Sequence, residues 1–86
     1  MNKVWSDDGW DDYLYRQTQD RKTLKRINEL LRDIERDPFG GKGKPEPLKY
    51  ELQGCWNRRI NDRDRLIYRV RNNQIEIAAC RSHYDD

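Results

Sequence analysis

Helical spacing of apolar residues predicts two helices in the first half of the chain. The first begins after Ser6, a residue able to cap a helix, and places Trp10, Tyr13 and Leu14 on one face. The second begins after Asp20 and ends before Pro38, because a proline pushes the preceding residue out of the helical region. Its apolar residues recur three or four positions apart: Leu24, Ile27, Leu30, Leu31 and Ile34.

A two-residue period replaces the helical one after residue 47 and predicts strands. It runs through residues 48–52, 55–60, 65–70 and 75–82, with turns at 53–54, 61–64 and 72–73. A short first strand is expected at residues 3–5. This order predicts an α+β fold, in which a short N-terminal strand and two helices precede a meander. The helices should pack on one face of a twisted antiparallel sheet. Residues 1–86 are expected to form a single domain.

Alternation also assigns side chains to the two faces of the sheet. Leu66, Tyr68 and Val70 should point at the helices, so Arg65 should point to the open face. Arg59 should do the same, because Trp56 and Ile60 are the expected core residues of the preceding strand. Strict alternation groups His83 with the core-like residues Ile75, Ile77 and Ala79. A bulge near Arg81 would release it, and the sequence shows none.

The composition predicts a small hydrophobic core and a charge that is unevenly distributed along the chain. Of the 86 residues, 34% are hydrophobic and 40% are charged, so help from a partner or a second copy is expected. Residues 1–37 carry 8 Lys/Arg against 9 Asp/Glu, whereas residues 38–84 carry 10 against 5. The basic part is either a nucleic-acid face or a solvated basic surface. No apolar run approaches membrane length, and Cys55 and Cys80 lack CxxC spacing. A cytoplasmic protein with reduced thiols and no membrane partner is therefore expected.

Three kinds of side chain in the second half suit acid–base chemistry on a phosphodiester. Glu46 lies between Pro45 and Pro47 on a stiff segment, which is a good mount for a general base, although a loop glutamate can equally be solvated. His83, the only histidine, is the natural general acid, unless it is merely a surface residue. Arg65 could hold a phosphate with two hydrogen bonds.

Further candidates are less specific, and no cofactor is called for. Tyr84 could stack on a base or position a phosphate, and Lys44, Lys49 and Arg59 could bind phosphates. A single histidine excludes a two-histidine acid–base pair and a multi-histidine metal cluster, and the proposed chemistry needs no metal. Walker, GxSxG and kinase motifs are absent.

Three segments carry a resemblance that covers essentially the whole chain. They are Lys42-Gly43-Lys44-Pro45-Glu46-Pro47-Leu48, Arg58-Arg59-Ile60 with Arg65-Leu66-Ile67-Tyr68, and Ala78-Ala79-Cys80-Arg81-Ser82-His83-Tyr84. In the first half, Val4-Trp5-Ser6, Trp10-Asp11-Asp12-Tyr13-Leu14 and Ile27-Asn28-Glu29-Leu30 also match. With them the chain closely resembles the YoeB toxins of the RelE/ParE toxin–antitoxin superfamily. The resemblance implies a RelE-like, microbial-ribonuclease-like fold and ribosome-dependent cleavage of mRNA in the A site. The implied partners are the bacterial 70S ribosome, mRNA and a YefM-type antitoxin, and the protein could be a homodimer.

The resemblance also implies a role for each matching residue. It gives the general base to Glu46, the phosphate-stabilising arginine to Arg65, the general acid to His83 and a C-terminal catalytic tyrosine to Tyr84. Two alternatives stay open at this point. One is a gyrase-poisoning toxin like the ParE branch, which would not need this set of residues. The other is a basic module that binds the ribosome and blocks the A site without cutting.

Overall fold

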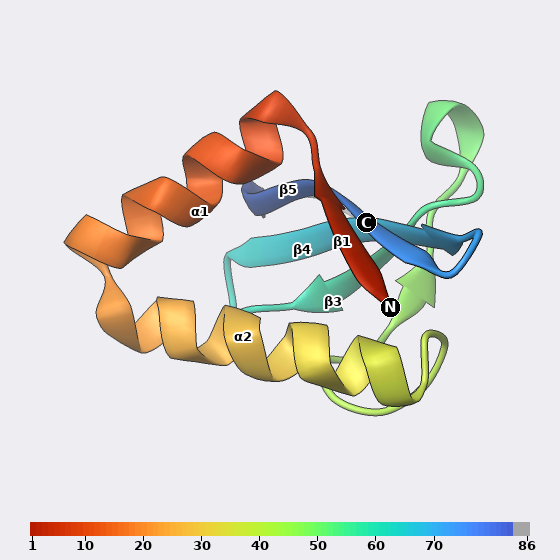
Figure 1. The fold of residues 1–86 in the computed structure, drawn as a ribbon, viewed down its shortest axis with the longest axis horizontal. Coiled ribbons are helices and arrows are strands. Elements are labelled where there is room, and N and C mark those ends of the chain that lie inside the picture. Colours follow the sequence, from red (N-terminus) through yellow and green to blue (C-terminus); the bar gives the residue numbers. More distant parts are fainter. Residues whose placement is uncertain (84–86) are drawn as a thin grey trace.

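A computed structural model describes residues 1–83, with only the backbone for residues 82 and 83. Its elements, in chain order, are β1 (Asn2–Trp5), α1 (Asp7–Gln19), α2 (Arg21–Arg36), β2 (Glu46–Pro47), the 3-10 helix η1 (Tyr50–Leu52), β3 (Trp56–Arg59), β4 (Asp64–Arg71) and β5 (Gln74–His83). Over these residues the strands form one sheet in the order β1-β5-β4-β3-β2, and both helices lie on the same side of it (Figure 1). The predicted α+β class, with two helices on one face, is confirmed.

The sheet is mixed, so the prediction of an antiparallel sheet was wrong for its first strand. β1 pairs in parallel with β5, from Asn2 opposite Gln74 to Trp5 opposite Ile77, and the other pairings are antiparallel. The reason is the path of the chain. After β1 it crosses one face as two helices, re-enters at the far edge as β2 and meanders back, so that the last strand arrives beside the first.

The expected strand at residues 48–52 was also wrong. Pairing stops after Glu46–Pro47, and residues 50–52 form η1 instead. Tyr50 has φ 58°, in the left-handed region, which a strand cannot contain. Leu48 is buried, and its amide donates to the carbonyl of Cys55 at 2.9 Å. The alternating pattern of residues 48–52 therefore belongs to a loop, and a hydrogen bond between residues 48 and 55 joins the two ends of this loop.

Both helices begin at the predicted caps. The Ser6 side chain accepts a hydrogen bond from the Gly9 amide at 2.9 Å, and the Asp20 carboxylate accepts one from the Thr23 amide at 3.1 Å. α2 ends at Arg36, before Pro38, as predicted. Helix α1 lies very close to the sheet, because a Cβ added at Gly9 would stand 2.7 Å from the carbonyl oxygen of Ile77.

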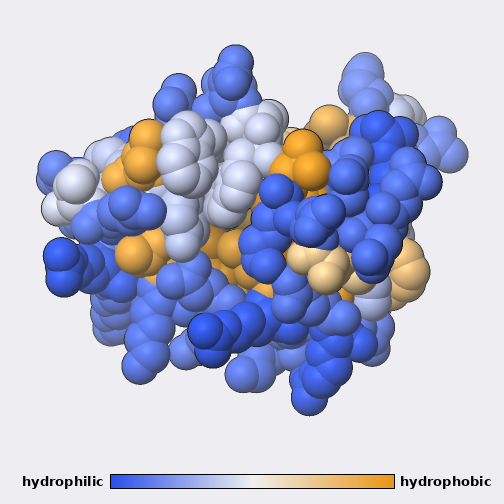
Figure 2. Space-filling model, viewed as in Figure 1, coloured by the Kyte–Doolittle hydropathy of each residue, from blue (hydrophilic) through white to orange (hydrophobic). Residues whose placement is uncertain are grey.

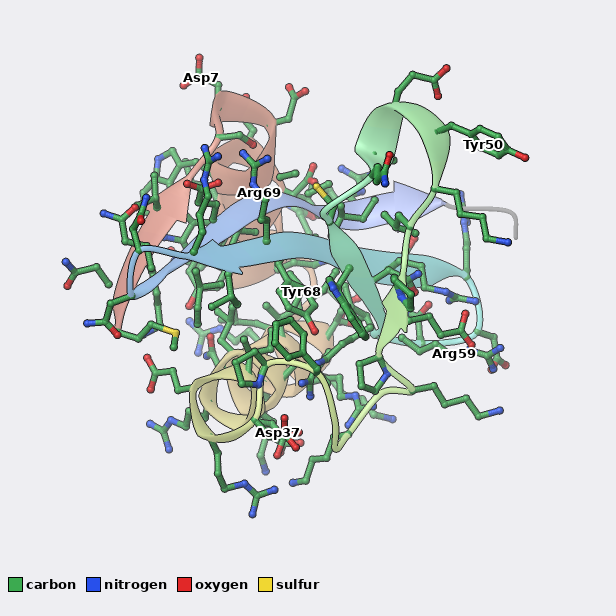
Figure 3. All side chains as sticks on the ribbon, turned by 90° about the vertical axis from the view of Figure 1, so that its right-hand side faces the viewer. Asp7, Asp37, Tyr50, Arg59, Tyr68 and Arg69 are labelled. Carbon is green, nitrogen blue, oxygen red and sulfur yellow. The ribbon has the colours of Figure 1, made fainter. Side chains whose placement is uncertain are left out.

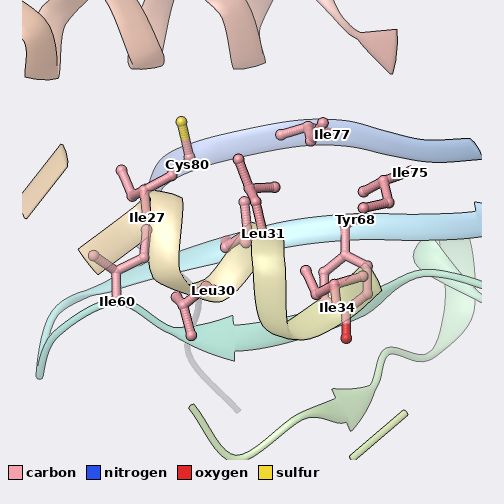
Figure 4. Packing of buried hydrophobic residues seen from close by; sticks show 10 residues of the cluster. Ile27, Leu30, Leu31, Ile34, Ile60, Tyr68, Ile75, Ile77 and Cys80 are labelled. Atoms are coloured by element: carbon pink, nitrogen blue, oxygen red, sulfur yellow. The ribbon is translucent and has the colours of Figure 1, made fainter. Parts of the chain in front are cut away.

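The core lies between α2 and the covered face of the sheet. Figure 4 shows one face of α2 packed against β4 and β5. The buried cluster consists of Ile27, Leu30, Leu31, Ile34, Ile60, Leu66, Tyr68, Ile75, Ile77 and Cys80. Leu66 and Tyr68 point at the helices as predicted, and Val70 packs against the cluster. Cys80 is a fully buried core residue, and burial raises the pKa of its thiol to about 12, which disfavours the reactive thiolate.

The predicted apolar face of α1 is only half covered. Tyr13 packs against the core, but Trp10 is 44% exposed and Leu14 40%. Figure 2 shows pale and orange surface around α1, next to hydrophilic surface below it. Within residues 1–83, no helix has the length and apolar character that crossing a membrane requires.

Strand β5 contains the irregularity that the sequence did not reveal. Arg65 pairs with Ser82, Ile67 with Ala79 and Tyr68 with Ile77, so β4 advances three residues while β5 advances five. Two register shifts therefore lie between Ile77 and Ser82. Ile77 and Cys80 are both buried in the core although they are three residues apart. Strict alternation thus fails in β5 before it reaches His83.

Candidate active site

The open face of the sheet brings three of the candidate residues to one corner. Glu46 in β2 pairs with Asn57 in β3, and Arg59, two residues further along β3, pairs with Arg65 in β4. Directly paired residues point to the same face, as do residues two apart on a strand. Glu46, Arg59 and Arg65 therefore share the face away from the helices. We call this group the open-face corner.

Glu46 is exposed on a short strand, and the residue opposite it is unusual. Asn57 is only 4% exposed, and its Nδ2 has no hydrogen-bond partner in residues 1–83. A buried amide nitrogen without a partner is uncommon and costs stability, and a functional role is one explanation for such a group. Asn57 is a residue of the corner that the sequence did not point to. The only hint in the sequence is that asparagine has a low strand propensity, yet it lies in the middle of a predicted strand.

A buried arginine fixes the loop that leads into β2. Arg58 is fully buried, and its guanidinium makes five hydrogen bonds. The acceptors are Tyr68 Oη (3.0 Å), Asp33 Oδ2 (2.6 Å) and the carbonyls of Lys42 (3.0 Å), Asp37 (2.6 Å) and Gly40 (2.7 Å). Figure 3 shows Tyr68 directed toward the loop around Asp37. The loop before Glu46 is thereby tied to the sheet at several points.

The partner carboxylate of Arg58 is strongly stabilised. The Lys42 amide donates to Asp33 Oδ2 at 2.7 Å, and Arg36 donates to Oδ1 at 2.6 Å. The Lys42 amide, followed by the Arg58 and Arg36 guanidinium groups, lowers the pKa of Asp33 to about 2 against the opposing effect of burial. The sequence did contain a signal for Arg58, because alternation placed it with Trp56 and Ile60 on the core face.

Arg65 is held by the turn that precedes it. It is 9% exposed, and its Nη1 donates to the carbonyls of Asn61 (2.9 Å) and Asp64 (3.2 Å). Among the atoms that the structure describes, which exclude the side chains of residues 82 and 83, no acceptor engages its Nε or Nη2. One side of the guanidinium is therefore fixed, while the other keeps donors available for an anion.

Arg59 and Arg65 place two like charges directly across from each other. Such a pair destabilises a sheet unless an anion offsets it. The Arg59 backbone is anchored, since its amide donates to the carbonyl of Gly43 at 2.7 Å. Its side chain is exposed and has no partner in the described part of the chain; Figure 3 shows it directed away from the core. The two arginines make the open-face corner a suitable place for a phosphate.

The two candidate lysines flank this corner along the chain. Lys44 is exposed two residues before Glu46 and has φ 51°, and Lys49 is exposed just before η1. No ion pair involving either is found within residues 1–83.

The remaining two candidates lie at the end of the last strand. The backbone of His83 pairs with Asp64, next to the pair of Arg65 and Ser82, so the histidine is in register with the start of β4. Tyr84 lies outside the described residues. Among the side chains that the structure describes, those of residues 1–81, no group of three or more from His, Cys, Asp and Glu could hold a metal ion.

Comparisons with known proteins point to one family. The family model described as "YoeB-like toxin of bacterial type II toxin-antitoxin system" matches residues 5–84. Toxin YoeB of Escherichia coli strain K12 is 55% identical over 84 residues, which cover 98% of this chain and 100% of that protein.

Solved structures give the same result for the fold. A YoeB/ParE toxin from Agrobacterium tumefaciens superposes with a TM-score of 0.95 at 44% identity, covering 98% of this chain and 100% of the other. Staphylococcus aureus YoeB, 47% identical, is similar both as a dimer (TM-score 0.92) and in a heterotetrameric complex with the antitoxin YefM (0.91), each covering 98% of both chains.

Proposed function

Since the chain belongs to the YoeB-like toxins of bacterial type II toxin–antitoxin systems, we propose that it is a metal-independent endoribonuclease that cleaves mRNA in the ribosomal A site. Cleavage there would stop translation. The observation that supports this activity best is the open-face corner. There a carboxylate and two arginines with free donors share one sheet face. His83 is assigned from the family resemblance, since its backbone register with Asp64 does not by itself put its side chain on that face.

The proposed reaction uses these groups in sequence. Glu46 removes the proton from a ribose 2′-hydroxyl, and the 2′-oxygen attacks the adjacent phosphorus. Arg65 stabilises the charge on the phosphorane through the nitrogens that the turn leaves free. His83 gives a proton to the 5′-oxygen as the P–O bond breaks. The products are a 2′,3′-cyclic phosphate and a 5′-hydroxyl end.

Other residues position the RNA in this proposal. Lys44, Lys49 and Arg59 bind neighbouring phosphates, and Tyr84 stacks on a base or holds the phosphate. A corner built from a two-residue strand and the end of a hairpin is small, so it cannot by itself hold a flexible RNA in line for attack. Such positioning can be worth ~7–11 kcal/mol. We therefore expect the ribosome to supply it by holding the mRNA.

The proposed partners follow from the family. We propose that a YefM-type antitoxin neutralises this toxin, as the complex of the S. aureus relative suggests, and that the protein acts in the cytoplasm on the 70S ribosome. The dimer of that relative supports a homodimer for this chain as well.

The test is to map mRNA ends on programmed ribosomes after adding the protein. We expect a cut in the A-site codon that leaves a 5′-hydroxyl, and a single-turnover rate orders of magnitude above that on the same naked RNA. The rate should fall with salt, because the contacts are to phosphates. Equal rates on naked RNA would indicate a free-standing ribonuclease. Translation arrest without cutting would indicate a ribosome-blocking module, and gyrase inhibition a toxin of the ParE type.

Matched variants would connect the activity to the corner. Arg65→Gln should abolish most cleavage. Arg69→Gln should not, because Arg69 lies on the same strand and face but forms an ion pair with Glu76 at 3.0 Å. His83→Gln should keep the fold and lose cleavage by ~10²–10⁴-fold, the usual contribution of a general acid. A His83→Gln rate within threefold of the unmodified protein would remove the histidine from the mechanism.

A further inference from the structure

We propose that helix α1 positions the catalytic ends of β4 and β5, and that Tyr15 and Arg16 in its last turns are positioning residues for Arg65 and His83. This inference rests on the proposed function, since it assigns a role within that active site. It starts from the irregular segment of β5, which decides where the last residues of the strand lie.

The N-terminal half of α1 stabilises that irregular segment. Ser6 Oγ donates to the carbonyl of Ala78 at 2.8 Å, and Asp12 Oδ2 accepts from the amide of Cys80 at 3.0 Å. Both groups belong to the part of β5 where the register with β4 shifts. A bulge leaves backbone groups without ladder partners, and here the side chains of Asp12 in α1 and of its capping residue Ser6 supply them. The shifts that place Ser82 opposite Arg65 therefore depend on α1.

The C-terminal half of α1 makes a second contact with β5, at Arg81, two residues before His83. The Arg81 guanidinium lies over the ring of Tyr15, with its Cζ 3.5 Å from the centroid. A cation over an aromatic face at this distance is an attractive contact that fixes the direction of the arginine. The last residues of β5 thus have a contact to α1 in addition to their pairing with β4.

Arg16 makes the corresponding contact to β4. Its side chain is 5% exposed, and Nη2 binds Asp64 Oδ2 at 2.8 Å while Nη1 binds Asp20 Oδ2 at 3.2 Å. Asp64 is the residue before Arg65, its carbonyl accepts from Arg65 Nη1, and its backbone pairs with His83. One buried ion pair therefore fixes the residue that touches both catalytic candidates.

The location of these contacts distinguishes positioning from general stabilisation. α1 reaches β4 at Asp64 and β5 at Arg81, one residue before Arg65 and two before His83. Charge stabilisation and proton transfer both depend on placement, and a 1 Å error can cost ~10²-fold in rate. Loosening either contact should therefore lower the rate of the chemical step more than the affinity for the substrate.

Asp64→Asn tests the ion pair, and Asp20→Asn is its matched control. Each variant removes one carboxylate charge from Arg16, and asparagine can still cap α2 at position 20. On programmed ribosomes we expect Asp64→Asn to lower kcat about tenfold, part of the ~10²-fold that misplacement can cost, with KM within about twofold. Asp20→Asn should keep kcat. Equal kcat losses in the two variants, or no loss in Asp64→Asn, would overturn the proposal.

Two substitutions of Tyr15 provide a second test with its own control. Hydrogen exchange adds a measurement that does not depend on cleavage activity. Tyr15→Leu removes the ring under Arg81 and should lower kcat, whereas Tyr15→Phe keeps the ring and should restore it. Hydrogen exchange at the amides of residues 81–83 should accelerate in Asp64→Asn and Tyr15→Leu only. If the unmodified toxin does not cut, the proposed function fails, and the exchange pattern alone decides whether α1 holds these strand ends. Unchanged exchange in both variants would overturn the positioning role.

Discussion

Two adjacent arginines show how differently the fold uses the same side chain. Arg58 is fully buried and satisfied by five hydrogen bonds, while Arg59 is exposed and its side chain has no partner in residues 1–83. The first residue joins the sheet to the loop before β2, and the second presents charge at the open-face corner. Strand alternation predicts this difference, because it groups Arg58 with Trp56 and Ile60 on the core face and puts Arg59 on the open face. Charge alone does not show which face an arginine occupies.

Arg58→Gln and Arg59→Gln should therefore fail in different ways. Removing one partner of a buried ion pair costs ~3–5 kcal/mol, so Arg58→Gln should lower the free energy of unfolding severely or prevent folding. Arg59→Gln should keep the melting temperature within a few degrees. It should weaken cleavage and reduce the salt dependence by about one phosphate contact. Thermal melts and cleavage assays at several salt concentrations measure both; a severely unstable Arg59→Gln variant would contradict this division.

At the scale of elements, α2 is tied to the loop before β2 by one carboxylate. Asp33 accepts hydrogen bonds from the Lys42 amide, Arg58 and Arg36. Folding lowers its pKa to about 2, below the value near 3.8 of an unperturbed aspartate. Its contribution to stability is therefore complete above about pH 4 and is lost as the pH falls toward 2.

Asp33→Asn should consequently be most harmful at neutral pH. The free energy of unfolding of the variant should lie below that of the unmodified protein at pH 7, and the difference should shrink between pH 4 and pH 2. Urea unfolding at pH 7, 4, 3 and 2 gives this comparison. A difference that stays constant with pH would mean that Asp33 does not hold the loop through its charge.

Some elements were predictable because local chemistry decides them. The capping residues Ser6 and Asp20 and the stop at Pro38 bound both helices, and the turn at Asn72-Asn73, with φ 54° and 56°, joins β4 and β5. The parallel pairing of β1, the loop fold of residues 48–52 and the shifts in β5 depend on distant contacts instead. The β5 shifts are stabilised by Asp12, 68 residues away from Cys80.

The candidate site divides in the same way. Arg59 and Arg65 could be assigned to one face because strand alternation holds in β3 and β4. Glu46 could not, because it pairs with β3 from β2, a strand that the sequence did not predict. Asn57 could not be assigned, since a missing hydrogen-bond partner becomes visible only in three dimensions. Nor could Asp64, whose link to α1 depends on how the helix lies on the sheet.

At the scale of the whole molecule, cationic side chains occur on both sides of the sheet with different surroundings. Lys44 and Lys49 are exposed on either side of Glu46 in the chain, near the open-face corner. On the other side, Lys22 and Lys25 are exposed on α2, which covers the opposite face (Figure 1). An antitoxin that inhibits by covering the open-face corner needs to cover Lys44 and Lys49 but not Lys22 and Lys25. An acidic, disordered segment suits this, because it can bury a large area and neutralise charge as it folds.

The two lysine pairs therefore serve as internal controls for how the antitoxin binds. In the complex with the antitoxin from its own operon, chemical labelling of Lys44 and Lys49 should fall sharply relative to the free toxin, while Lys22 and Lys25 should stay reactive. Binding should weaken as salt is added, because exposed charges are screened over about 10 Å at 0.1 M ionic strength. An antitoxin that abolishes cleavage while Lys44 and Lys49 label as in the free toxin would show that inhibition acts from another surface.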